Sequence, residues 1–163
     1  MKEAKALAIL QEIYRLESIS FLRYLVKVSG PPVHDEADKK ALALFQVLYL
    51  DVERNIRGLG NFLEEHGTAS SETRWPLSYA GFNYLRPRYL LRPTVERVRN
   101  QVEQVEAQAR ALEAVDWRQA RELAETVLRR DQTTLGRLSQ AVEETPEQTA
   151  EPAQLKGTSA SRW

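Results

Sequence analysis

The chain has 163 residues, and its 23 Lys and Arg balance its 23 Asp and Glu, so the formal net charge is zero. This length predicts one domain with a sizeable core, and the balanced charge argues against a broad surface for nucleic acid or acidic membranes. The absence of cysteine excludes disulfides, thiolate metal sites and cysteine nucleophiles. Without a long apolar stretch for a signal peptide or a membrane span, we expect a cytoplasmic protein.

Four long segments have the periodicity of helices. They are expected over residues 2–28, 35–66, 94–114 and 116–144. Gly30 before Pro31 is a typical stop for the first. Pro93 falls in the first turn of the third, where its missing N–H costs little. Asp116 is the expected N-cap of the fourth.

The connections predict how these helices are arranged. Short links join the first helix to the second and the third to the fourth, which favours two antiparallel hairpins. The segment 67–92 between them carries aromatic residues and, because a long free connection is rare in a compact domain, should cross and pack on the bundle. The expected fold is therefore all-α, an antiparallel four-helix bundle over residues 1–144 with a long crossover between helices 2 and 3. Residues 145–163 have the composition of a disordered tail.

Three of the four core stripes carry a carboxylate near the helix midpoint, namely Glu17, Asp51 and Asp131. With a rise of about 1.5 Å per residue, their distances from the helix ends nearly match, which predicts one common level. Such acids either lie at a stripe edge open to solvent or need a metal, a basic side chain or a proton. Arg54, one turn beyond Asp51, is the predicted internal cation, in a core ion pair with Glu17 and Asp51.

Residues 7–142 resemble the ferritin-like superfamily, closest to bacterioferritin and rubrerythrin-type domains. The likeness is carried by Glu17, by Asp51-Val52-Glu53-Arg54 with the helix end at 61–67, and by Asp131-Gln132-Thr133-Thr134. The resemblance implies a di-iron centre built from a Glu in helices 1 and 3 and Glu-x-x-His in helices 2 and 4. Here Arg54 and Thr134 replace the two histidines, both motif Glu are Asp, and the helix 3 ligand position falls on Val98. The position of the family's heme-binding Met carries Val52.

These departures predict a ferritin-like protein that has lost most di-iron ligands and acts as a non-catalytic structural or partner-binding protein, with no catalytic or cofactor-binding residue. The alternative is an iron-binding or iron-oxidising protein, with iron or another divalent metal on a residual site of Glu17, Asp51 and Asp131. A third hypothesis is a small-ligand binder that uses Tyr84 and Arg88 of the crossover.

Partners are expected to be proteins, with no nucleic acid and no membrane. Helix 1 carries apolar residues outside its stripe, Ile13, Leu22 and Leu25, which predict a homo-oligomer, a dimer or larger. A second protein partner is predicted to dock through the C-terminal tail, where Trp163 is an apolar tip.

Overall fold

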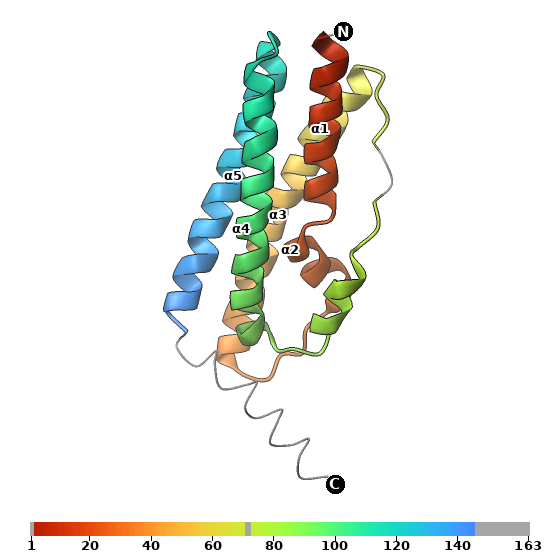
Figure 1. Ribbon diagram of the computed structural model, residues 1–163. Helices are drawn as coiled ribbons and strands as arrows, with labels where there is room; N and C mark the ends of the chain where they lie inside the picture. Colours follow the sequence, from red (N-terminus) through yellow and green to blue (C-terminus); the bar gives the residue numbers. More distant parts are fainter. Residues whose placement is uncertain (1, 71–72, 146–163) are drawn as a thin grey trace.

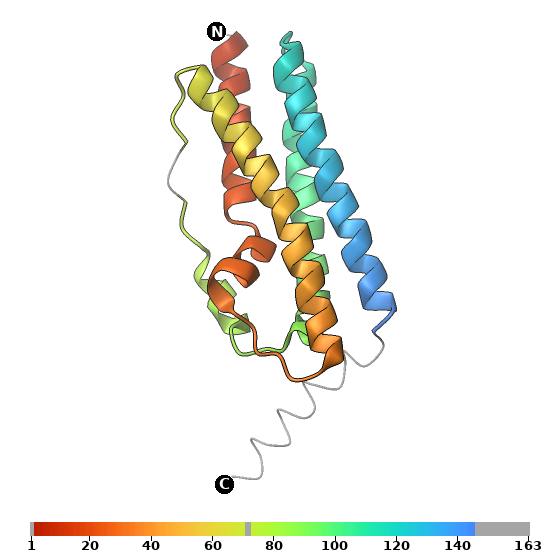
Figure 2. The ribbon, with the colours of Figure 1, turned by 180° about the vertical axis from the view of Figure 1, so that it is seen from behind.

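The computed structural model describes residues 2–70 and 73–145, and within these ranges the regular structure is entirely helical. The elements are α1 (Lys2–Ser18), α2 (Phe21–Tyr24), the π-helical turn η1 (Leu25–Ser29), α3 (Glu36–Glu65), the 3-10 helix η2 (Leu77–Phe82), α4 (Pro87–Glu113) and α5 (Arg118–Glu143). The all-α prediction is confirmed. The four long helices α1, α3, α4 and α5 lie side by side (Figures 1 and 2). No helix in the described ranges is long and apolar enough to cross a membrane.

The path of the chain alternates short turns with one long return. Helices α1 and α3 are antiparallel, and so are α4 and α5 (Figure 1). Because the connection, described over 66–70 and 73–86, runs back along the outside of the first hairpin, α3 and α4 point the same way (Figures 1 and 2). The expected tail lies outside the described residues from Pro146 onward.

Helix α1 ends ten residues earlier than predicted. The chain leaves the helix after Ser18 and re-enters helical geometry at Phe21, which turns α2 aside from the α1 axis (Figure 2). The carbonyl groups released by this break find side-chain donors, as buried backbone groups require. Arg23 donates to the Ser18 carbonyl at 3.0 Å, and the Tyr79 hydroxyl donates to the Ile19 carbonyl at 2.9 Å.

Two other helix ends differ from the sequence prediction. Helix α4 begins at Pro87 rather than at Thr94, so Pro93 lies inside the helix. Pro87 occupies the first turn, where proline is favoured, and this lets the helix begin about two turns earlier. Helix α5 begins after Trp117 without a side-chain cap, so Asp116 is not its N-cap.

An ion-pair cluster joins the start of α3 to the start of α4. Asp35 caps α3 by accepting from the Asp38 backbone N–H at 2.9 Å. Asp38 is fully buried and accepts from Arg86 at 2.7 Å, while Arg86 and Arg88 both donate to Asp35. Burial opposes the charge of Asp38, but the hydrogen bonds from Arg86 and from the backbone of His34 and Arg88 outweigh it, so its pKa is lowered.

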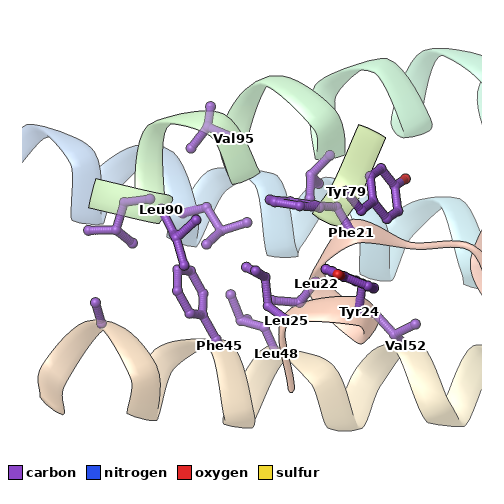
Figure 3. Packing of buried hydrophobic residues seen from close by; sticks show 14 of the residues in the cluster. Phe21, Leu22, Tyr24, Leu25, Phe45, Leu48, Val52, Tyr79, Leu90 and Val95 are labelled. Carbon is purple, nitrogen blue, oxygen red and sulfur yellow. The ribbon is translucent and has the colours of Figure 1, made fainter. Parts of the chain in front are cut away.

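The apolar side chains form two clusters, one toward each end of the molecule. The first includes Phe21, Phe45 and Leu138, together with Tyr79 of η2 (Figure 3). The second includes Ile13 and Leu63 among its members. The crossover is thus part of the core, as expected, because Tyr79 packs edge-on against Phe21 with ring centroids 5.0 Å apart.

The predicted dimer surface on the first helix is wrong. Ile13, Leu22 and Leu25 are fully buried inside their own chain. The break after Ser18 turns Leu22 and Leu25 into the first cluster, and Ile13 lies in the second. An oligomer stays a prediction, and these three residues do not support it.

The packing of α2 on the crossover predicts a large effect of Phe21→Ala. Phe21 is 1 % exposed and contacts the Tyr79 and Phe82 rings. We expect its removal to lower the free energy of unfolding by about 3–5 kcal/mol, since a buried phenylalanine leaves a cavity. Urea unfolding measures this. Leu77→Ala is the matched control in the same crossover, because Leu77 is 94 % exposed and its loss should cost less than about 0.5 kcal/mol. Equal effects of the two variants would contradict this packing.

Candidate functional site

A polar layer separates the two apolar clusters, near the middle of α3, α4 and α5 and at the end of α1. Each long helix contributes one side chain to it: Glu17 from α1, Asn55 from α3, Gln101 from α4 and Asp131 from α5. Glu17 is fully buried, and Asn55 and Asp131 are 1 % and 5 % exposed. Buried polar groups must be paired, so the contacts within this layer decide what it can do.

The amide of Asn55 bridges the two carboxylates. Its Nδ2 donates to Glu17 Oε2 at 3.1 Å and to Asp131 Oδ1 at 3.2 Å. Gln101 Nε2 donates to the other oxygen of Glu17, Oε1, at 2.8 Å. Both amides therefore point N–H groups at the acids.

Arg130 sets the orientation of the Asn55 amide. Its Nη1 donates to Asn55 Oδ1 at 3.1 Å. A guanidinium has donors and no acceptor, so only the amide oxygen can face it. The NH₂ group of Asn55 must then face Glu17 and Asp131. Arg130 thus acts on the acids through Asn55.

Asp131 has less hydrogen bonding than its burial requires. Its Oδ2 atom is buried and has no hydrogen-bond partner among the described residues. Burial raises the pKa of the Asp131 carboxyl well above its ordinary value, and the nearby charge of Glu17 raises it further. The raised pKa of the Asp131 carboxyl favours its protonated form.

The structure brings together two of the three predicted acids. Glu17 and Asp131 share the polar layer, whereas Asp51 is only half-buried and pairs with Arg54 on the surface at 2.8 Å. The Arg54 side chain is 63 % exposed, so the predicted core ion pair of Arg54, Glu17 and Asp51 is wrong.

The physical reason is the position of the buried face on α3. Its buried positions run through Leu48, Val52 and Asn55. The stripe expected from the sequence instead runs through Leu48, Asp51 and Asn55. Asp51 lies about 100° around the helix from Val52, which is the buried position. Asp51 and Arg54 therefore fall on the edge and the outside of α3, where water solvates their charges.

Sequence reasoning missed three participants in the layer. Asn55 lies on the stripe expected from the sequence, but no role was predicted for it. A single amide among apolar core positions does indicate a buried hydrogen-bond donor. Gln101 flanks the aliphatic stripe of α4, one turn after Val98. For Arg130 no local pattern was available, because its role depends on contact with Asn55, 75 residues away in sequence.

The side chains of the layer do not fit a di-iron centre. Such centres use carboxylates from all four helices with two histidines. Here only two carboxylates are present among the described residues of the layer. Thr134, at the expected position of one histidine, is buried, and the two histidines of the chain, His34 and His66, are exposed at other sites. In the parts of the chain that the structure describes, no group of three or more His, Asp or Glu is arranged to hold a metal ion.

The crossover residues proposed as a ligand site do not converge. Tyr84 is 91 % exposed. Arg88 points into the ion-pair cluster with Asp35 and Asp38 at the start of α3. This arrangement favours a structural role for Arg88.

Comparison with known proteins identifies no relative: no family model, no curated protein and no solved structure matches the chain.

The buried acid pair predicts a specific pH dependence of stability. Because the pKa of Asp131 is raised in the folded state, this group stabilises the fold fully below its unfolded value, 3.8, and the stabilisation is lost as pH rises through the raised pKa. The pKa values of Asp35 and Asp38 are lowered from the same 3.8. Their contributions to the free energy of unfolding are therefore lost only as pH falls below about 4, outside the range of the Asp131 effect.

We therefore expect Asp131→Asn to abolish this loss between pH 4 and pH 8. Urea unfolding of Asp131→Asn and of the unchanged protein across this range measures the free energy of unfolding of each. As pH rises, that of the variant should increase relative to that of the unchanged protein. Asp51→Asn is the control, since Asp51 is half-buried on the surface of the same bundle. Parallel pH curves for the Asp131 variant and the unchanged protein would contradict the assignment.

Proposed function

We propose that this chain is a ferritin-like four-helix bundle protein without a di-iron centre, and that its role is structural or partner-binding rather than catalytic. The observation that carries the proposal is the Asn55 amide, which donates to both buried carboxylates. In this proposal the polar layer holds a proton and a hydrogen-bond network where the resembled family holds metal.

The path of the chain supports the ferritin-like part of the proposal. Two antiparallel hairpins joined by one long crossover are the connectivity of that class. The polar layer also draws on all four long helices, as the family's metal ligands do. On α3, where the family has its Glu-x-x-His motif of helix 2, this layer has Asn55. On α4, where the family has the Glu of helix 3, it has Gln101.

The orientation of the donors argues against a bound cation. A metal ion needs lone pairs directed toward it, and carboxylate and carbonyl oxygens supply them. Here Asn55 and Gln101 both turn N–H groups toward Glu17. If Asn55 turned its oxygen toward a metal ion, it would lose the hydrogen bond from Arg130. The guanidinium of Arg130 would then face the amide NH₂ group, which cannot accept a hydrogen bond from it.

One observation favours a second candidate function, the binding of iron or another divalent metal. The buried Oδ2 atom of Asp131 has no hydrogen-bond partner in the described part of the chain. A proton satisfies it in the first proposal, and a cation held with Glu17 would satisfy it in the second. The two proposals thus differ in what neutralises the same oxygen.

Metal content separates the two candidates. We expect protein purified after growth in iron- and manganese-rich medium to hold less than about 0.1 metal ion per chain, because two carboxylates with donor amides form a poor site. Elemental analysis of the purified protein measures this, with Glu17→Ala analysed beside it. Near-stoichiometric iron that disappears in Glu17→Ala would overturn the first proposal and support the second.

A substitution at Asn55 tests the role of its amide directly. Asn55→Asp removes the donor and places a third carboxylate in the layer, so we expect a lower Tm at pH 7, because like charges in a buried site repel. Divalent manganese should restore part of the Tm in this variant by binding the folded state.

Asn55→Ser is the control, because it also loses the bridge but adds no charge, and manganese should leave its Tm unchanged. The unchanged protein should likewise show no shift. A manganese-dependent rise in Tm in the unchanged protein would show that the amide does not exclude cations.

A further inference from the structure

An open groove lies at the end of the molecule where α3 and α4 begin and α5 ends. It has a volume of about 670 Å³. The apolar part of its lining comes from all three helices: Ala41, Leu44, Val47, Leu91 and Ala141. Val47 is 49 % exposed. The groove thus leaves apolar surface open directly beside the first core cluster.

Two cations on the groove lack partners. Lys40 of α3 and Arg137 of α5 line it, both are exposed, and neither forms an ion pair within the described part of the chain. Arg88, which also lines the groove, is engaged by Asp35 and Asp38. One acid, Glu144, also lines the groove, so basic side chains outnumber acidic ones there. This excess of positive charge beside apolar surface favours an occupant that combines carboxylates with a few apolar side chains.

The chain itself continues from this groove. Thr145, the last described residue of this part of the chain, lines it. The sequence 146–155 that follows contains Glu147 and Glu151, no basic residue, and Leu155. Pro146 and Pro152 disfavour a simple continuation of α5, because proline interrupts helical hydrogen bonding.

The lengths are compatible with a return into the groove. The α3 wall from Ala37 to Val47 rises about 15 Å at 1.5 Å per residue. Roughly ten extended residues reach about 33 Å, which is enough to turn at Thr145 and lie along this wall. A covalently tethered segment also has a high effective concentration, so contacts that are individually weak suffice.

We propose that residues 146–155 fold back into this groove, with Leu155 on its apolar surface and the carboxylates of Glu147 and Glu151 beside Lys40 and Arg137. The proposal is independent of what the polar layer binds.

Disulfide trapping tests this proposal, because the chain contains no cysteine. The trapping pair is Val47→Cys with Gln154→Cys, and the control pair is Gln46→Cys with Gln154→Cys. Gln46 is exposed, neighbours Val47 on the same helix, and does not line the groove. We expect the disulfide within one chain to form at least about tenfold faster in the trapping pair, since only the groove position meets the segment at raised effective concentration.

A further variant tests the chemistry of the contact. Leu155→Asp in the trapping pair should slow the disulfide to the rate of the control pair and leave the far-ultraviolet circular dichroism and Tm unchanged. Equal rates for the two pairs would overturn the proposal. Disulfides that form between two chains, at a rate that rises with protein concentration, would overturn it as well and assign the groove to a second copy of the chain.

Discussion

The buried acids Glu17 and Asp131 impose the central constraint on this structure, and the amide of Asn55 meets it. Uncompensated carboxylates cost too much free energy to bury, so the helices that carry them must present donors at the same level. Asn55 supplies one amide nitrogen to both acids, and Gln101 supplies a second donor to Glu17. These contacts join all four long helices at the level where the apolar core divides into two clusters.

The break in the first helix follows directly after this layer. Glu17 sits in the last turn of α1, and the next carbonyl groups are satisfied by Arg23 and by the Tyr79 hydroxyl of the crossover. The crossover therefore completes hydrogen bonds that the helix gives up, besides packing on Phe21 and Tyr24 (Figure 3). A connection with both roles is a structural element of the bundle, which explains its aromatic composition.

The proposed relation to ferritin-like proteins concerns the path of the chain, while the chemistry of the layer differs. Both arrangements place polar side chains from four helices at one level in an apolar core. In the resembled family, carboxylates and histidines surround a cation. Here amide donors face two acids, and the raised pKa of Asp131 favours a proton in the same place. The two arrangements thus differ in what neutralises the acids at the same level of the core.

The sequence alone determined the elements that depend on local chemistry. Periodicity located the four long helices, although α1 ends ten residues before its predicted end and α4 begins seven residues before its predicted start. The core stripes placed Glu17 and Asp131 inside. Both acids are buried because their neighbours one turn away on either side are apolar or buried, a pattern that is visible in one dimension.

Only the tertiary structure decided that Val52 rather than Asp51 lies on the buried face of α3 and that Asn55 bridges the two acids. It also decided the end of α1 at Ser18 and the role of Arg130. Steps of three and four residues both fit a helix, so the sequence leaves its buried face uncertain by about 100°. That uncertainty is removed when neighbouring helices pack. Asn55 faces inward because two acids on other helices need its donors, and α1 ends where it does because Tyr79, 60 residues from Ile19, satisfies the released carbonyl. Both results depend on contacts between residues far apart in the chain, which no local pattern records.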